Sequence, residues 1–237
     1  MTKSDFPQKI KYSLIIPFFN EEHSVEPLFD SLKKVMNGFK EDYEVIFIND
    51  GSRDNTLSLL ECLSRSNDFV RVISFDTNRG QGKAIEEGFR NVRGDVVITM
   101  DGDLQNDPVD IPMLTHKIDQ GFDLVCGWRY LRNDTVIKKI KSKIGNFFQR
   151  KITGLNIHDI SCTMRAYRRE IIKEVVFYGE FEFSVLPYII SRDKNIKITE
   201  VKVKDNYRKF GKSKYRTLRT IFGTMYDYIR LIVKNKR

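Results

Sequence analysis

Short apolar runs alternate with amphipathic segments along the first half of the chain, and this alternation constrains the fold more than any other feature of the sequence. The runs have the length of strands that are buried on both faces of a sheet. They lie at residues 12–19, 44–48, 70–75, 95–100 and 123–127. Between them, Leu28, Leu32 and Val35 recur at helical spacing, and a helix is expected over residues 81–92. The pattern predicts an α/β fold in which helices flank a mainly parallel sheet.

Polar side chains directly follow the ends of these predicted strands. Asn20 and Glu21 follow the first strand, Asp50 follows the second, and Asp101 and Asp103 follow the fourth. In a parallel sheet, ligands bind beyond the carboxyl ends of the strands. We therefore expect these side chains to surround one crevice, with the acidic half of the chain forming a nucleotide-binding layer.

The two halves of the chain carry opposite net charge. Residues 1–128 contain 14 basic and 22 acidic side chains, a net of −8, whereas residues 129–237 contain 27 basic and 10 acidic ones, a net of +17. The basic half is expected to face an anionic partner. Nucleic acid is one such partner, but the sequence shows none of its recognition motifs and no aromatic stacking set among the basic residues. We therefore expect no nucleic acid partner.

Composition excludes several other classes of protein. Of the 237 residues, 41% are hydrophobic and 31% are charged, as in a globular rather than a disordered chain. Three widely spaced cysteines fit neither a disulfide framework nor a zinc ribbon, which favours a reducing cytosol. The N-terminal segment does not fit a signal peptide, and no stretch approaches the roughly 18 uncharged apolar residues of a membrane span.

Residues 101–105, with the sequence DGDLQ, carry the strongest chemical signal. Asp101, Asp103 and Gln105 offer hard oxygen ligands from one turn, and Mg²⁺ or Mn²⁺ prefers such ligands and shares them with substrate phosphates. The alternative is a turn in which an aspartate caps the next helix, with residues 106–108 as its start.

Residues 78–84, with the sequence NRGQGKA, form a second candidate site. Glycines there permit close approach of the backbone, and the N-terminus of a helix favours anions. The alternative is an ordinary helix cap.

Three strings in this order carry a family resemblance. Residues 16–22 (IPFFNEE), 49–52 (NDGS) and 101–105 (DGDLQ) resemble the strings I-P-x-Y-N-E, D-D-G-S and D-A-D-L-Q of inverting family 2 glycosyltransferases, which have the nucleotide-diphospho-sugar transferase (GT-A) fold, a Rossmann-like α/β fold. The chain departs from these strings at Phe19, which lacks a tyrosine hydroxyl, at Asn49 and at Gly102.

The second half of the chain narrows the resemblance to a subgroup. Residues 127–129 (GWR), 159–169 (DISCTMRAYRR) and 208–215 (RKFGKSKY) resemble the polyprenyl-phosphate glycosyltransferases. The set is similar to dolichyl-phosphate mannose synthases and, more closely, to bacterial undecaprenyl-phosphate 4-deoxy-4-formamido-L-arabinose transferases. The likeness implies one GT-A catalytic domain over residues 1–237. Its nucleotide and metal half covers about 10–128, and its acceptor and membrane-facing half covers about 129–237.

The resemblance implies a reaction. A sugar would pass with inversion from a nucleotide-diphospho-sugar, with UDP favoured, to a polyprenyl phosphate such as undecaprenyl or dolichyl phosphate, for cell-envelope glycan or lipid modification. Mg²⁺ or Mn²⁺ would be the cofactor. One alternative is a GDP-mannose-dependent enzyme like dolichyl-phosphate mannose synthase. Another is a sugar-nucleotide pyrophosphorylase, although those enzymes open with a glycine-rich loop after the first strand.

The resemblance also implies roles for individual residues. The expected metal ligands are Asp101, Asp103 and Gln105. The expected catalytic residues are Asp101, Asp103, Arg129 and Arg208. The expected nucleotide-binding residues are Pro17, Phe19, Glu21, Ile48, Asp50, Gly82, Asp101, Gly102, Asp103 and Lys214. The acceptor phosphate is expected to meet Arg129, Lys138 and Lys143.

Other candidate residues have less direct roles. Asp159 either orients the acceptor or a sugar hydroxyl, or pairs with Arg165, and the ion pair is favoured. Cys162 is not expected to be a nucleophile, because no base has a recognisable spacing to it. The histidines are expected to be surface or structural residues. They are His23, His116 and His158.

Membrane contact is expected at the basic half. Lysines within residues 138–143 lie beside an apolar face formed by Ile140, Phe147 and Phe148, which suits either a helix in the interface of an anionic membrane or completion of the core. The related bacterial enzymes continue into transmembrane helices beyond the segment that matches residues 226–233. A truncated chain, a naturally soluble form and an anchoring partner subunit are the alternatives. The expected location is the cytoplasm, peripheral at the cytoplasmic face of the membrane.

Overall fold

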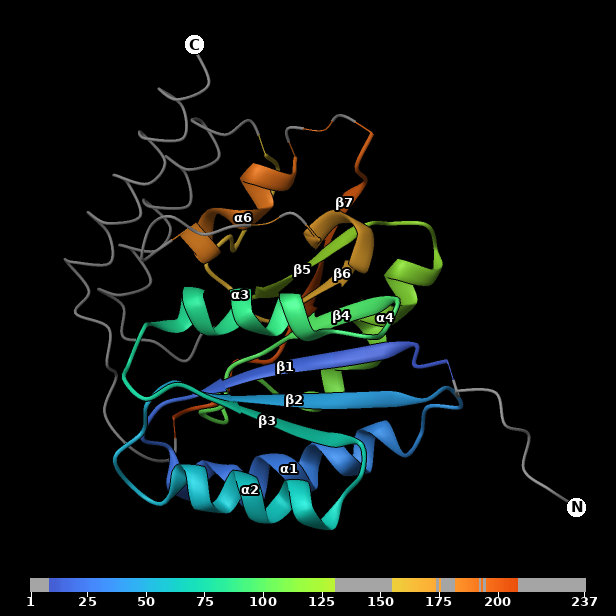
Figure 1. The fold of residues 1–237 in the computed structure, drawn as a ribbon. Coiled ribbons are helices and arrows are strands. Elements are labelled where there is room, and N and C mark those ends of the chain that lie inside the picture. The colour runs from blue at the N-terminus through green and yellow to red at the C-terminus, as the bar shows by residue number, and fades with distance from the viewer. Residues whose placement is uncertain are drawn as a thin grey trace, which may run out of the picture.

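The computed structural model describes residues 9–130, 155–173, 175, 182–191, 193 and 195–208 (Figure 1). Within these residues, seven strands form one sheet in the order β3-β2-β1-β4-β6-β5-β7. The strands are β1 (Tyr12–Phe18), β2 (Tyr43–Asn49), β3 (Val70–Ser74), β4 (Val96–Thr99), β5 (Leu124–Arg129), β6 (Arg165–Arg168) and β7 (Ile198–Val203). The helices are α1 (Glu22–Met36), α2 (Thr56–Ser66), α3 (Gln81–Asn91), α4 (Ile111–Asp119) and α6 (Glu182–Ile190), with short 3₁₀ turns η1 (Pro108–Asp110) and η2 (Arg169–Ile172).

The sheet is mainly parallel, as predicted, with one reversed strand. β1 pairs in parallel with β2 and β4, β2 with β3, and β5 with β7. β6 runs antiparallel between β4 and β5. All five predicted strands are present, each within one or two residues of its predicted bounds, whereas β6 and β7 were not predicted from the sequence.

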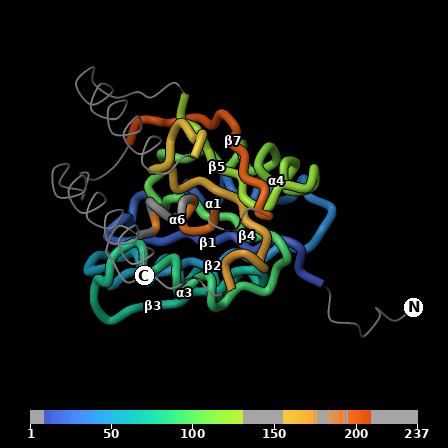
Figure 2. Tube along the Cα trace, turned by 90° about the horizontal axis from the view of Figure 1, so that it is seen from above, coloured from blue at the N-terminus to red at the C-terminus, as the bar shows by residue number. Residues whose placement is uncertain are grey.

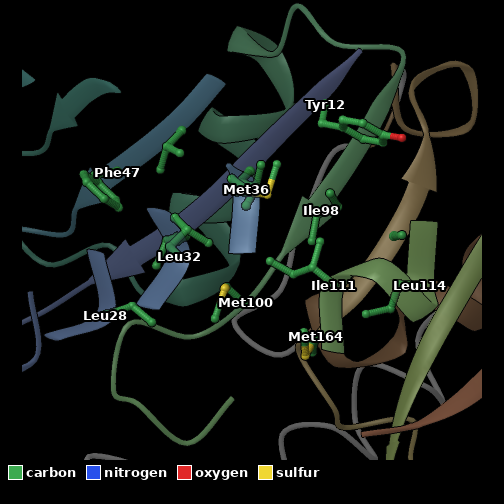
Figure 3. Close-up of a cluster of buried hydrophobic side chains, with 14 of the residues drawn as sticks. Tyr12, Leu28, Leu32, Met36, Phe47, Ile98, Met100, Ile111, Leu114 and Met164 are labelled. Atoms are coloured by element: carbon green, nitrogen blue, oxygen red, sulfur yellow. The ribbon is translucent and has the colours of Figure 1, made fainter. Parts of the chain in front are cut away.

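Helices cover both faces of the sheet because alternate residues of each strand point to opposite sides. On β1, Leu14 and Ile16 pack in one hydrophobic cluster with α1 and α4, and Ile15 packs in a second cluster with α3 and α6. Figure 3 shows the first cluster, in which Leu28, Leu32 and Met36 of α1 approach the sheet. The central strands β1, β2 and β4 are therefore buried on both faces, which is why their apolar runs are continuous and do not alternate with polar residues.

The strand order changes direction at β1, since β2 and β3 lie on one side of it and β4 on the other. Figure 2 views the chain from above and shows the β5 and β7 end of the sheet opposite the β3 edge. A crevice beyond the carboxyl ends of parallel strands forms at such a switch point. The turns after β1, β2 and β4 therefore define the candidate site.

Candidate active site at the carboxyl ends of the strands

The turns that follow β1 and β2 are hydrogen-bonded to each other. The backbone N–H of Asn20 donates to Ser52 Oγ at 3.0 Å, and that of Arg53 donates to Asn20 Oδ1 at 2.7 Å. The N–H of Glu21 donates to Thr56 Oγ1 at 2.9 Å. Asn20 has φ of 49°, a left-handed conformation that asparagine tolerates better than most residues. These bonds fix the position of Glu21 at the edge of the crevice.

Asp50 organises the glycine-containing turn that precedes α3. Its buried carboxylate accepts hydrogen bonds from Asn78 Nδ2 at 2.8 Å and from the backbone N–H groups of Arg79 and Gly80 at 2.7 and 3.0 Å. Burial raises the pKa of Asp50, although the two backbone bonds act in the opposite direction. Gly51 has φ of 68°, and a Cβ there would lie 2.4 Å from the backbone of Thr77. A direct contact of Asp50 with the nucleotide stays a prediction.

The asparagine that replaces the first acid of the family string has a defined role. The Asn49 side chain is 1% exposed, and its Nδ2 donates to Ser74 Oγ at 2.9 Å. Its Oδ1 accepts from the N–H of Ser52 at 3.2 Å. A neutral amide donates and accepts at once, whereas a carboxylate would place a second buried negative charge next to Asp50.

Asp101 lies at the end of β4 and is held by residues from two other segments. Its Oδ1 accepts from Gln81 Nε2 at 2.5 Å, and its Oδ2 accepts from Thr163 Oγ1 at 2.7 Å. Its backbone N–H donates to Asn106 Oδ1 at 2.9 Å. Sequence reasoning missed these three partners, although each of them lies within a segment that had been singled out. The side chain of Asp107 caps η1 by accepting a hydrogen bond from the N–H of Val109. The helix cap that was the alternative interpretation is therefore present next to the Asp101 site.

Asp103 forms an ion pair with an arginine from the segment after β7. Its Oδ1 accepts from the N–H of Gln105 at 3.1 Å, and its Oδ2 lies 3.3 Å from Arg208 Nη2. The same nitrogen of Arg208 also contacts Glu21 Oε1. Arg208 Nε is buried with no hydrogen-bond partner among the residues that the structure describes. The guanidinium thus bridges the β1 and β4 turns and keeps hydrogen-bonding capacity unused.

Burial disfavours the ionised form of both aspartates of this site, Asp101 and Asp103. Burial, followed by the negative charge of Asp103, raises the pKa of Asp101 to about 7. Burial also raises the pKa of Asp103, against the opposing effect of Arg208. Two hard carboxylates that resist ionisation fit a divalent cation that neutralises them.

The expected metal ligands form an open set. Over the described ranges, no group of three or more histidine, cysteine, aspartate or glutamate side chains is arranged to hold a metal ion. Mg²⁺ commonly uses one or two carboxylates and completes its coordination with water and substrate phosphates, so Asp101 and Asp103 fit this use. Gln105 is half-buried, and its carbonyl accepts from the N–H of Asn206 at 2.9 Å, which joins the metal turn to the segment that carries Arg208.

The expected nucleotide-binding residues differ in accessibility. Pro17 and Phe19 are half-buried at the end of β1. Ile48 has no exposed surface and packs in the core cluster that contains α3, and its contact with the nucleotide stays a prediction. Gly82 is buried within α3. A Cβ on Gly102 would lie 2.7 Å from the Phe18 ring and 2.8 Å from the Pro17 carbonyl oxygen, which explains why glycine replaces the alanine of the family string.

Arg129, at the end of β5, is paired with Asp159. Its Nε donates to Asp159 Oδ2 at 2.8 Å and its Nη2 to Oδ1 at 3.0 Å. The favoured pairing of Asp159 with Arg165 is therefore wrong. Arg165 is fully buried and donates instead to the carbonyl oxygens of Phe183 at 2.8 Å and Ile160 at 2.6 Å. Its register opposite Thr99 on β4 turns it toward α6.

An aromatic cluster lies at Trp128, which precedes Arg129 on β5 and points to the opposite face of the strand. The rings of Trp128 and His158 stack with centroids 4.2 Å apart, and Lys202 Nζ lies 5.5 Å from the Trp128 centroid. His158 also pairs with Glu200, so it has the structural role that was expected. Cys162 is buried, and burial raises the pKa of its thiol to about 12, which agrees with the prediction that it is no nucleophile.

Several expected residues lie outside the residues that the structure describes. They are Lys138, Lys143 and Lys214, together with both basic amphipathic segments. Among the helices that are described, none has the length and apolarity to cross a bilayer.

Sequence comparison places the chain among known enzymes. Residues 13–176 match the profile of glycosyl transferase family 2. The chain is 36% identical over 228 residues to the dodecaprenyl-phosphate galacturonate synthase of Rhizobium johnstonii, covering 94% of this chain and 68% of the relative. It is 36% identical over 220 residues to the undecaprenyl-phosphate 4-deoxy-4-formamido-L-arabinose transferase of Yersinia pestis, covering 92% of this chain and 66% of the relative. The chain thus spans about two thirds of the length of these relatives.

Structural comparison shows the same fold in distant proteins. Glucosyl-3-phosphoglycerate synthase from Mycobacterium tuberculosis, in complex with phosphoglyceric acid, matches with a TM-score of 0.73 at 18% identity, covering 93% of this chain and 79% of that one. Its complex with Mn²⁺, uridine diphosphate and phosphoglyceric acid matches with a TM-score of 0.70 at 19% identity, covering 91% and 76%. The match to the family profile and the sequence relatives show that this chain belongs to glycosyltransferase family 2, with the GT-A fold that the strand-end motifs predicted.

Proposed function

We propose that the protein transfers a sugar, with inversion, from a nucleotide-diphospho-sugar to a polyprenyl phosphate. The observation that carries the proposal is the arrangement of cations around the β4 carboxylates: Arg208 contacts Asp103, and Arg129 is close enough to affect the pKa of Asp101. The names of the relatives from Rhizobium johnstonii and Yersinia pestis each contain a polyprenyl phosphate and a sugar. A UDP-sugar is the favoured donor, and a structural neighbour binds uridine diphosphate.

The donor diphosphate would lie over the carboxyl end of β4. Asp101, Asp103 and Gln105 would hold Mg²⁺ or Mn²⁺, which when bound would neutralise charge on the leaving nucleoside diphosphate. Arg208 would move from Asp103 and Glu21 to the diphosphate oxygens, where its unused Nε finds an acceptor. Lys214 is proposed to assist it. Pro17, Phe19, Glu21, Asp50 and the glycines at 82 and 102 would shape the nucleotide crevice.

The acceptor requires charge neutralisation more than proton removal. A phosphate monoester is already anionic near neutral pH, so its oxygen attacks the anomeric carbon without a strong general base. The new bond joins that oxygen to the anomeric carbon, and the bond from this carbon to the diphosphate breaks, with the electron pair leaving on the nucleotide. Arg129, Lys138 and Lys143 would hold the acceptor phosphate against the repulsion between the two anions.

The proposal extends to location and organisation. Residues 1–237 would form one catalytic domain, with the nucleotide and metal half over about 10–128 and the acceptor half over about 129–237. The net charge of +17 on residues 129–237 suits the anionic cytoplasmic face of a membrane, where the enzyme would act peripherally in cell-envelope glycan or lipid modification. A partner subunit that supplies a membrane anchor belongs to the same proposal.

A donor and acceptor panel tests the reaction. UDP-, GDP- and CDP-sugars are compared by thermal shift with Mn²⁺ or Mg²⁺, since a bound donor raises the apparent melting temperature. Labelled sugar from the stabilising donor is then offered with undecaprenyl phosphate in detergent. Transfer that EDTA stops is the expected result. Stabilisation by GDP-mannose alone would revise the donor, and release of pyrophosphate from a nucleoside triphosphate and a sugar phosphate would overturn the proposal.

A further inference from the structure

The ion pair between Arg129 and Asp159 is more tightly built than a surface salt bridge. Asp159 is 2% exposed, and its two carboxylate oxygens meet Nε and Nη2 of Arg129 at 2.8 and 3.0 Å. Ser161 Oγ donates to Asp159 Oδ1 at 3.0 Å and accepts from Arg129 Nη2 at 3.1 Å. The backbone N–H of Arg129 also donates to Asp159 Oδ2 at 3.4 Å. These contacts restrain the guanidinium plane as well as its position.

The contacts leave one edge of the guanidinium available. Arginine has five N–H donors, one on Nε and two on each Nη. The Nε donor and both Nη2 donors are directed to Asp159 and Ser161. The two donors of Nη1 make no hydrogen bond to the described residues of the chain. Arg129 therefore retains a pair of donors that suits a phosphate oxygen.

The surrounding charges show why this arginine needs a dedicated partner. Glu21, Asp101 and Asp103 lie at the same crevice, and the positive charge of Arg129 already lowers the pKa of Asp101 against the effect of burial. Arg208 shows that these carboxylates attract an arginine at the crevice, since its Nη2 contacts both Asp103 and Glu21. An unrestrained Arg129 would be drawn to the same carboxylates and away from an incoming anion.

We propose that Asp159 and Ser161 are positioning residues that hold Arg129 by Nε and Nη2, so that its Nη1 edge receives the phosphate of the acceptor. The inference rests on the proposed function, because it assigns Arg129 to the acceptor. It predicts that loss of Asp159 weakens use of the acceptor and leaves use of the donor nearly intact.

The test measures kcat and KM for undecaprenyl phosphate and, separately, for the donor sugar nucleotide. Asp159→Asn should lower kcat/KM for the acceptor by about 10-fold or more, mainly through KM, while the donor KM changes by less than about 2-fold. In the Arg129→Gln background, Asp159→Asn should cause no further loss, because it acts only through Arg129. Ser161→Ala should lower acceptor kcat/KM by about 2- to 5-fold.

A matched control separates positioning from stability. Asp123 pairs with Arg168 Nε at 3.2 Å at the opposite end of β5, so Asp123→Asn removes an aspartate–arginine ion pair, although a more exposed one, away from the site. It should lower the melting temperature without a selective change in acceptor KM.

Three results would overturn the positioning role. They are equal kinetic effects of Asp159→Asn and Asp123→Asn, a full additional loss in the Arg129→Gln background, and an unchanged acceptor kcat/KM in Arg129→Gln. If Asp159→Asn does not fold, Ser161→Ala decides, and unchanged acceptor kinetics would overturn the role. A wild-type enzyme that transfers sugar to another acceptor and never to a polyprenyl phosphate would instead refute the proposed function, and the inference would fall with it.

Discussion

Arg129 and Arg208 both reach the crevice beyond the sheet, but they are held in different ways. Arg129 pairs with the buried carboxylate of Asp159, whose two oxygens accept hydrogen bonds from Nε and Nη2. Arg208 lies on Glu21 and Asp103, one of which is a proposed metal ligand, and its Nε has no partner among the described residues. Arg129 is therefore fixed by a buried partner of its own, whereas we propose that Arg208 is exchangeable and leaves Asp103 when a metal binds there.

The largest expected effect comes from removing the carboxylate on which Arg208 rests. Asp103→Asn should lower transfer by about 10³-fold, because the site loses a hard ligand and half of its negative charge. Electron paramagnetic resonance of Mn²⁺ should show weakened binding, and circular dichroism should show a retained fold. Activity that persists in Asp103→Asn, or in EDTA, would refute the role of the metal. The ion pair between Arg208 and Asp103 would then be purely structural.

Removal of the exchangeable cation should affect metal and donor in opposite directions. Arg208→Ala should lower kcat by about 10²-fold, because a cation is lost from the developing charge on the diphosphate. In the absence of nucleotide it should bind Mn²⁺ more tightly than wild type, since the competitor for Asp103 is gone. Lys204→Ala is the matched control, because Lys204 is an exposed cation of the same segment that pairs with Asp107 at 3.6 Å. Weaker Mn²⁺ binding in Arg208→Ala would contradict an exchangeable role.

Metal binding at Asp101 should depend on pH. The pKa of Asp101 is about 7 in the folded protein against 3.8 for an ordinary aspartate. The folded protein therefore binds more protons than the unfolded chain between these values, so this group's contribution to stability is present below pH 3.8 and is lost as pH rises through about 7. Because a cation binds the ionised form, the rise in melting temperature caused by Mn²⁺ should grow between about pH 6 and 8. Asp101→Asn should remove this trend, and a pH-independent shift in wild type would refute it.

The smallest expected effect is at the glycine between the two carboxylates. Gly102→Ala should destabilise the protein by about 1–3 kcal/mol, because the added Cβ meets the Phe18 ring at 2.7 Å. Thermal denaturation measures the loss, and Phe18→Leu should recover part of it in the double variant. Since Gly102 is on the β4 turn, donor kinetics should suffer more than acceptor kinetics. Equal losses in donor and acceptor kinetics would contradict separate donor and acceptor subsites at Arg208 and Arg129.

Sequence reasoning predicted the first five strands because their apolar runs are uninterrupted, and it predicted the strand-end carboxylates because topology brings such ends together. It missed β6 because that strand has four residues and an arginine at each end. Arg165 looks like a surface residue in the sequence, yet it is fully buried and bonded to backbone carbonyls. Burial of this kind depends on sheet register, which no local pattern contains.

The partner of Asp159 could not be deduced for a related reason. Arg165 is six positions away and Arg129 is thirty, so proximity in sequence favoured the wrong arginine. The choice depends on β6 lying antiparallel to β5, which aligns Cys126 with Arg165 and sends the preceding segment past the end of β5. Thr163, in that segment, was missed as a partner of Asp101 for the same reason.

The reversed strand β6 separates the two positions that we propose for phosphate groups. β4 and β5 point the same way because each is antiparallel to β6, so their carboxyl ends meet at one edge, two strand widths or about 10 Å apart. The segment that enters β6 passes between those ends and supplies Thr163 to Asp101 on one side and Asp159 to Arg129 on the other. The insertion of one strand between β4 and β5 thus sets the distance between the proposed donor and acceptor anions.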